Sequence, residues 1–98
     1  MKSRRLLWSD VAATDLAGIE AYVRAYDLEA AARLIRRLVD SAGRLTERPA
    51  MGRIGRLPGT REWLVPRTKY LLIYKVGEDI VEIHRVMHGA RSWPVIVR

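Results

Sequence analysis

The stretch KYLLIYKVGEDIVEIHRVM, residues 69–87, decides the fold of this chain. Residues 69–76 are apolar on both faces of an extended strand, which is typical of a strand in the centre of a sheet. Gly77 begins a tight turn, and residues 80–87 return, rich in β-branched side chains, as the hairpin partner. The sequence therefore predicts an antiparallel strand pair at the centre of the fold.

Two helices are predicted to precede this hairpin. Apolar residues recur at spacings of three and four within residues 12–26 and again within residues 28–45, which is the period of a helix with one buried face. Ser9 can cap the first helix and Asp27 the second, and Pro49 requires the second to end before it. Their short link predicts an antiparallel helical hairpin. Opposite charges four residues apart predict three ion pairs on the second helix: Glu29–Arg33, Arg36–Asp40 and Asp40–Arg44.

Two shorter segments complete the predicted sheet. Residues 3–8, SRRLLW, have the pattern of a first strand, and residues 61–65, REWLV, of a strand that Pro66 ends. Residues 50–60 hold three glycines and a proline without periodicity, so we expect a loop, and the glycine spacing fits no phosphate-binding motif. The order strand, helix, helix, three strands predicts one α+β domain over residues 1–98. Its antiparallel sheet is covered on one face by the helical hairpin.

The amino-acid composition limits which partners and which kinds of site the chain can have. Eighteen Lys and Arg against eleven Asp and Glu give a net charge of +7, which favours an acidic partner such as nucleic acid or an acidic protein segment. The excess is concentrated in residues 48–69. The chain has no cysteine, which excludes disulfides, thiolate zinc sites and a cysteine nucleophile. No apolar run approaches the ~18 residues of a membrane span, and we expect a cytoplasmic protein that does not bind membranes.

The candidate chemistry is concentrated in residues 82–94, EIHRVMHGARSWP. On a strand, His84 and His88 lie about 13 Å apart, too far to share a metal. We interpret His84 as a half-buried structural residue, whereas His88, at the end of its strand, can face a ligand. No Ser-His-Asp set or carboxylate pair is supported, and we expect no metal and no cofactor.

What remains is arginine with histidine, a combination that holds phosphate or carboxylate groups. Arg61, Arg85 and Arg91 are candidates to converge at one end of the sheet. Trp93 has two open interpretations. It can stack on a base or anchor a protein contact, or it can close the core after the last strand.

The chain resembles the RelE/ParE superfamily of toxins from bacterial type II toxin–antitoxin systems. The resemblance rests on four segments in order along nearly the whole chain, and together they are most similar to the ParE branch, often called plasmid stabilisation proteins. These segments are RPAMGR (48–53), GTREW (59–63), KYLLIYKV (69–76) and EIHRVMHGARSWP (82–94).

The resemblance implies one of two mechanisms. RelE-type members cleave messenger RNA on the ribosome, whereas ParE-type members poison DNA gyrase without hydrolysing anything. The nuclease pattern has Lys-x-Lys on the strand before the central one, where this chain has Glu62 and Leu64. It has arginine directly after the central tyrosine and again beyond the last strand, where this chain has Leu71 and Gly89.

We therefore expect a gyrase poison whose target contact includes Arg85, His88, Arg91 and Trp93. The first alternative is a ribosome-dependent mRNA interferase, an endoribonuclease that would use Arg61, Arg85 and His88. The second is a non-toxic basic binding module with the same fold. The resemblance also implies a cognate antitoxin whose acidic C-terminal segment folds onto the toxin in a hetero-oligomer. For that contact we predict Arg33, Arg37, Arg53 and Arg56.

Overall fold

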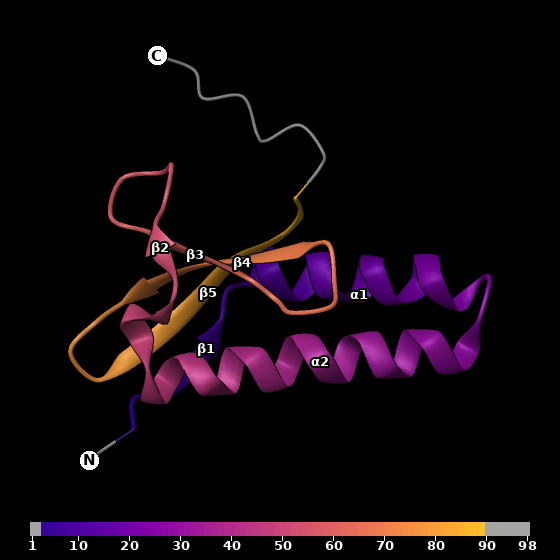
Figure 1. Ribbon diagram of the computed structural model, residues 1–98, viewed down its shortest axis with the longest axis horizontal. Coiled ribbons are helices and arrows are strands. Elements are labelled where there is room, and N and C mark those ends of the chain that lie inside the picture. The colour runs from indigo at the N-terminus through magenta and orange to yellow at the C-terminus, as the bar shows by residue number, and fades with distance from the viewer. Residues whose placement is uncertain (1–2, 90–98) are drawn as a thin grey trace.

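Two helices pack on a five-stranded sheet, so the predicted α+β class is confirmed (Figure 1). The structure is a computed structural model that describes residues 3–89 of the chain. The elements in chain order are β1 (Arg5–Trp8), α1 (Asp10–Arg24), α2 (Leu28–Glu47), the 3₁₀ helix η1 (Pro49–Met51), β2 (Arg53–Ile54), β3 (Arg61–Leu64), β4 (Tyr70–Val76) and β5 (Ile80–His88).

The strands lie in the order β1-β5-β4-β3-β2. The predicted antiparallel pairing of β3, β4 and β5 is confirmed. The prediction of a wholly antiparallel sheet is wrong, because β1 runs parallel to β5, with Arg5 opposite Ile80 and Trp8 opposite Ile83. A parallel pair needs a long crossover connection, and here the two helices together with β2, β3 and β4 supply it. The sheet is therefore mixed.

The segment predicted as a loop, residues 50–60, contains regular structure. Most of η1 lies in it, and β2 pairs antiparallel with the first two residues of β3. Gly52 joins these elements at a point of close approach, where an added Cβ would lie 2.5 Å from the Tyr74 hydroxyl and 2.6 Å from the Glu62 carbonyl oxygen. Two paired residues are too few to give a strand periodicity, which explains why the sequence pattern predicted only a loop.

Side chains cap both helices as predicted. The hydroxyl of Ser9 accepts from the Ala12 N–H at 3.0 Å, and the carboxylate of Asp27 accepts from the Ala30 N–H at 3.0 Å. The three predicted ion pairs on α2 are absent from the described residues, where the pair at this spacing is Glu20–Arg24 on α1, at 3.9 Å. Long exposed side chains gain little from such pairing in water.

The core lies between α2 and the centre of the sheet. Its largest fully buried side chains come from both layers: Leu38, Leu45, Val65, Leu72, Ile73, Tyr74, Val81 and Ile83. The tip of the helical hairpin extends beyond the sheet (Figure 1). For this reason Tyr26 and Leu28, which the sequence pattern assigned to the buried stripes, are 78% and 67% exposed. Within residues 3–89 no helix combines the length and hydrophobicity needed to cross a membrane.

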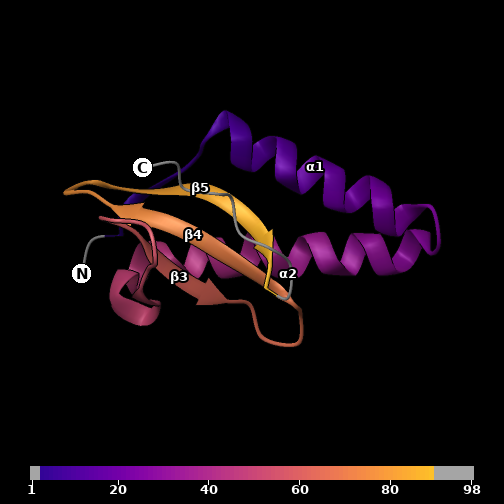
Figure 2. The ribbon, with the colours of Figure 1, turned by 90° about the horizontal axis from the view of Figure 1, so that it is seen from above.

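Helix α1 covers the edge of β5 that β1 leaves unpaired. Figure 2 shows α1 running alongside β5. The Asp15 carboxylate on α1 accepts from the Val86 N–H at 3.0 Å and from the Arg85 side chain at 2.8 and 3.2 Å. A register shift leaves His84 bulged out of the β4–β5 pairing, and its carbonyl oxygen accepts from the Ser9 hydroxyl at 2.9 Å. An exposed strand edge is thus closed by two side chains.

We predict that Asp15→Ala lowers the free energy of unfolding by about 2 kcal/mol, because the Val86 N–H and the Arg85 guanidinium both lose their acceptor. Urea denaturation followed by circular dichroism measures the loss. Glu78→Ala, at an exposed turn position, is the matched control and should change stability by less than about 0.5 kcal/mol. Equal stability of the two variants would contradict the role of Asp15.

Candidate functional site

The site is built around Glu62, the residue at one of the places where the nuclease pattern has lysine. Its side chain is buried, and the residue is 2% exposed. Its carboxylate accepts from the Arg53 guanidinium at 3.0 Å and from the Arg56 backbone N–H at 2.9 Å, and Arg56 Nε lies 3.3 Å away. Burial alone would raise the pKa of Glu62, but these hydrogen bonds outweigh burial, and the net result is a lowered pKa.

Tyr74 fixes the same segment from the helix-covered side of the sheet. Its hydroxyl donates to the Pro49 carbonyl oxygen at 2.7 Å and accepts from the Gly52 N–H at 2.9 Å. Burial raises the pKa of Tyr74, so the phenol keeps its proton for the bond to Pro49. Arg61 donates to the Gly52 carbonyl oxygen at 2.7 Å. Residues 49–56 are therefore held from both faces of the sheet.

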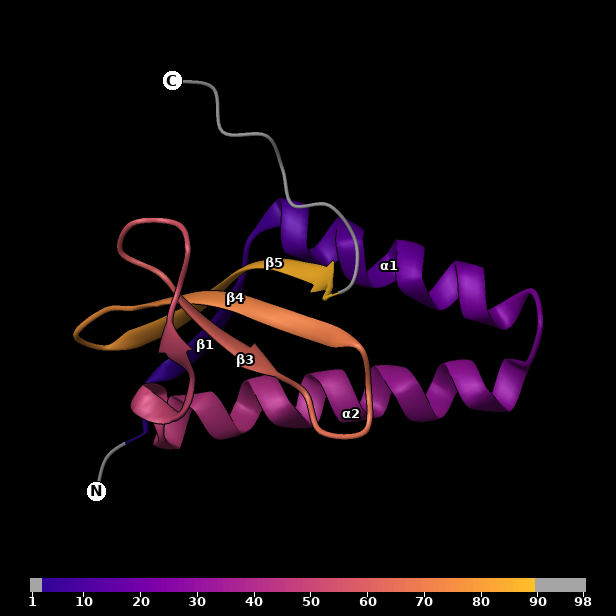
Figure 3. The same cartoon turned by 45° about the horizontal axis from the view of Figure 1, so that its top comes forward.

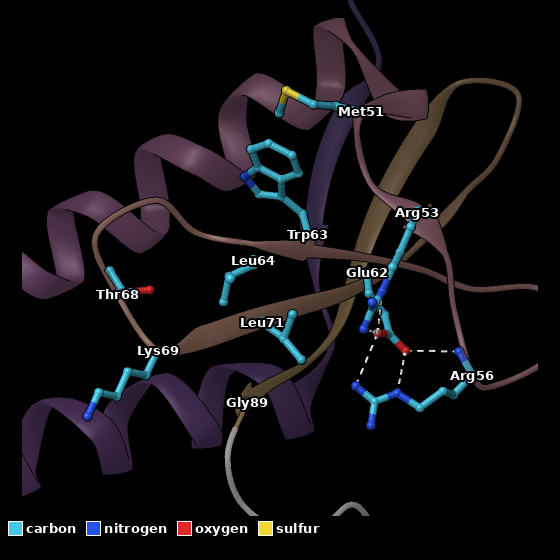
Figure 4. A pocket seen from close by; sticks show the side chains of 10 residues that line it. All are labelled: Met51, Arg53, Arg56, Glu62, Trp63, Leu64, Thr68, Lys69, Leu71 and Gly89. Atoms are coloured by element: carbon cyan, nitrogen blue, oxygen red, sulfur yellow. Dashed lines mark hydrogen bonds and ion pairs between the residues drawn. The ribbon is translucent and has the colours of Figure 1, made fainter.

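An apolar groove lies beside this anchored segment (Figure 4). Its cavity volume is about 610 Å³. We define the groove by its apolar residues Met51, Trp63, Leu64 and Leu71. Basic side chains flank it, with Arg53 and Arg56 at one end and Lys69 at the other.

Two features leave this groove open to a partner. Leu64 is 53% exposed, although it is a large apolar residue. Because β2 pairs only with Arg61 and Glu62, the last two residues of β3 also form a free strand edge. The groove thus offers an apolar surface, a strand edge and a basic rim.

Arg85 is already engaged within the fold. Its guanidinium pairs with Asp15 at 2.8 Å, where the two side chains are 33% and 16% exposed. The hydrogen bond to Asp15 raises the pKa of Arg85. A target anion would therefore have to compete with the Asp15 carboxylate for the Arg85 guanidinium. The role of Arg85 in target contact stays a prediction.

His88 lies at the other end of the sheet from Arg61. It is opposite Tyr70 in the pairing of β4 with β5, with ring centroids 5.4 Å apart, and it lines a cleft together with Asp15 and Tyr22 of α1. Arg61 is opposite Tyr74, which is four residues, or about 13 Å, along β4 from Tyr70. The structure therefore does not bring the three nuclease candidates Arg61, Arg85 and His88 together.

The four arginines predicted for an antitoxin fall into two groups. Arg53 and Arg56 flank the groove, whereas Arg33 and Arg37 are on α2, and Arg37 lines a separate cleft. Arg91 and Trp93, predicted for target contact, lie outside the described residues. His84 is half-buried, and its Nε2 lies 2.9 Å from a Glu82 carboxylate oxygen, as expected of a structural histidine.

Sequence reasoning missed the two carboxylates that organise the arginines, Asp15 and Glu62, and the groove residues Trp63 and Leu64. Asp15 is 70 residues from Arg85, so no local pattern connects them. The pair Trp-Leu directly before Val65-Pro66 was a usable signal, because adjacent large apolar residues on one strand must place one of them on the open face.

Comparison with known proteins agrees with this architecture. A family model described as "ParE toxin of type II toxin-antitoxin system, parDE" matches residues 6–93. The chain is 37% identical over 97 residues to "Putative toxin Y4kP" of Sinorhizobium fredii, covering 99% of this chain and 100% of that one. It is 33% identical to Toxin RelE2 of Caulobacter vibrioides, covering 89% of this chain and 97% of the relative.

Two solved structures share the fold. One is described as a chromosomal ParDE toxin–antitoxin system from P. aeruginosa, with a TM-score of 0.80 and 22% identity over 88% of this chain and 96% of that one. The other is the toxin–antitoxin complex RelBE2 from Mycobacterium tuberculosis, with a TM-score of 0.66 and 24% identity over 89% of this chain and 99% of that one.

The fold and its relatives define the chain as a toxin of the RelE/ParE superfamily from a type II toxin–antitoxin system. Within that superfamily, it belongs to the ParE toxin family.

We predict that Glu62→Gln lowers the free energy of unfolding by about 2 kcal/mol at pH 7, because the charged hydrogen bonds to Arg53 and Arg56 are lost. The lowered pKa of Glu62 means that its contribution is present above the unfolded pKa, about 4.3, and is lost as pH falls through the folded value. Urea midpoints measured from pH 7 to pH 3 should therefore converge for wild type and variant. The exposed Glu47→Gln is the control, and a difference that persists unchanged at pH 3 would refute this account.

Proposed function

We propose that this toxin poisons DNA gyrase, does not itself hydrolyse nucleic acid, and is neutralised by a cognate antitoxin. The observation that carries the proposal is the environment of Glu62. A nuclease of this fold needs cations free to hold a scissile phosphate and to donate a proton. At the corresponding strand position this chain has a buried carboxylate, which binds Arg53 and Arg56 instead.

Two further observations support the absence of hydrolysis. Arg85, the arginine on β5, is neutralised by Asp15, and His88 lies far from Arg61 along β4. The family assignment favours gyrase as the target, since the resemblance to ParE-type toxins implies it. The ribosome-dependent nuclease remains the competing function, and its strongest support is His88, which lines an open cleft.

The antitoxin contact is proposed for the apolar groove. Its apolar residues would accept side chains of an amphipathic segment, and Arg53, Arg56 and Lys69 complement acidic residues around them. The free edge of β3, at Trp63 and Leu64, supplies backbone polar groups that a bound segment would satisfy. Both solved structures that share the fold are described as toxin–antitoxin assemblies, which supports a partner of this kind.

The target is tested with purified protein, gyrase, relaxed plasmid and ATP. We expect blocked supercoiling and, after denaturation of gyrase, linear plasmid, because a poisoned enzyme stays trapped on cleaved DNA. Unchanged supercoiling by gyrase, combined with codon-specific cuts in translated mRNA, would establish the nuclease instead. Normal growth of bacteria that express the soluble chain alone would establish a non-toxic binding module.

The groove is tested with Leu64→Asp. A charge at this exposed apolar position should raise the Kd for the cognate antitoxin by at least ~30-fold, the effect of losing one central anchor, and co-expressed antitoxin should no longer protect the cells. Val11→Asp, at a 51% exposed position on α1, is the control and should leave protection intact. Unchanged antitoxin affinity of Leu64→Asp would remove the groove from the interface.

A further inference from the structure

A second cleft lies between α2 and the connection from β3 to β4. Figure 3 shows this connection reaching down to the middle of α2. The cleft has a cavity volume of about 280 Å³, just below the usual range for small-molecule sites, about 300–1,000 Å³. Its lining residues are Arg37, Asp40, Ser41, Arg44, Val65, Pro66 and Arg67.

Three guanidinium groups surround this cleft. Arg37 and Arg44 are seven residues apart on α2, so they lie on one helix face about 10 Å apart along its axis. Ser41, which is 8% exposed, lies between them, and Arg67 faces them from the connection. Among residues 3–89, none of the hydrogen bonds or ion pairs that the structure gives uses the side chains of these three arginines. They differ in this respect from Arg53 and Arg85.

Arg67 occupies a backbone conformation that favours glycine. Its φ is +65°, and among the described non-glycine residues it alone has a positive φ. Pro66 and Arg67 are the central residues of a turn in which the Val65 carbonyl oxygen accepts from the Thr68 N–H at 3.1 Å and from its hydroxyl at 2.9 Å. Proline followed by a left-handed residue is the pattern of a type II turn, whose second central position prefers glycine. An arginine there raises the free energy of the fold, which suggests a function for its side chain.

The surroundings of the three arginines indicate which ligand they fit. The cleft has two apolar residues, and one of them, Val65, is 1% exposed. A protein segment needs apolar anchors of the kind the groove provides, and this cleft lacks them. The guanidinium plane matches phosphate oxygens in a bidentate way, and Asp40 offsets only part of the positive charge.

We propose that Arg37, Arg44 and Arg67 form a phosphate-contact site for duplex DNA, distinct from the apolar groove. This site goes beyond the proposed gyrase target, since it adds a direct contact with the DNA backbone. Arg37 thereby receives a role different from the antitoxin contact predicted from the sequence. Such contacts position a protein on DNA and carry no sequence information.

The site is tested by fluorescence anisotropy of the purified chain with a labelled 20-base-pair duplex at several salt concentrations. Arg67→Gly should weaken binding at least ~5-fold and reduce the slope of log K against log salt by about 1, since one phosphate contact is lost. Its urea midpoint should not fall, because glycine is favoured at this φ. The double variant Arg37→Gln/Arg44→Gln should reduce the slope by about 2.

Arg36→Gln is the matched control, because Arg36 is an exposed α2 arginine outside the cleft. Its slope should fall by much less than 1. Wild-type binding by Arg67→Gly and by the double variant would overturn the site, as would an equal loss in Arg36→Gln. Poly-glutamate that binds these arginines more tightly than the duplex at the same salt would also overturn it, in favour of an acidic protein. The assay contains no gyrase, so its result and that of the supercoiling assay are independent.

Discussion

The buried carboxylate of Glu62 is the interaction on which the apolar groove and its basic rim depend. A carboxylate with 2% exposure is stable in the fold only if cations and N–H groups replace the water it has lost. Arg53 and Arg56 do so, and because both precede β3 in the chain, they hold β2 and the following loop against it. Tyr74 holds the same segment from the other face through Pro49 and Gly52. The groove keeps its shape because one of its walls is fixed from two sides.

The positions of a few acids determine which arginines are available to other molecules. Asp15 neutralises Arg85, and Glu62 binds Arg53 and Arg56. Arg4 and Arg61 donate to the backbone carbonyl oxygens of Gly77 and Gly52, so they too contribute to the fold. In the second cleft, Asp40 is exposed and forms no ion pair of this kind within residues 3–89, and its neighbours Arg37 and Arg44 remain available. A net charge of +7 therefore overstates how much cationic surface any one partner meets.

The sequence predicted the features that depend on local chemistry. Helix caps at Ser9 and Asp27, the end of α2 before Pro49 and the β4–β5 hairpin follow from residues within a few positions of each other. It failed where the partner is distant in the chain. The parallel pairing of β1 with β5 joins residues about 75 positions apart, as does the bond from Ser9 to the His84 carbonyl oxygen.

The candidate site was predicted less well than the fold, for the same physical reason. Residue type alone indicated that the arginines were functional, but their roles depend on carboxylates that the fold brings to them. Arg85 illustrates this, since its sequence context, between His84 and His88, suggested a ligand contact, whereas its side chain closes the edge of β5 through Asp15. For Arg67 the sequence context is that of a solvated surface arginine, and only its backbone conformation distinguishes it.

Glu62 on β3 stands at one of the four positions where this chain departs from the nuclease pattern. Lysine there would point a cation from β3 at whatever lies on the open face. Glutamate supplies no cation there and pairs with Arg53 and Arg56, so one carboxylate offsets part of the positive charge beside it. The same carboxylate fixes the basic rim of the apolar groove, the surface that we propose for the antitoxin contact. The phosphate contact proposed above lies on the α2 side of the molecule, at Arg37, Arg44 and Arg67. Partner binding and DNA contact would then occupy different faces, and one molecule could be engaged by both.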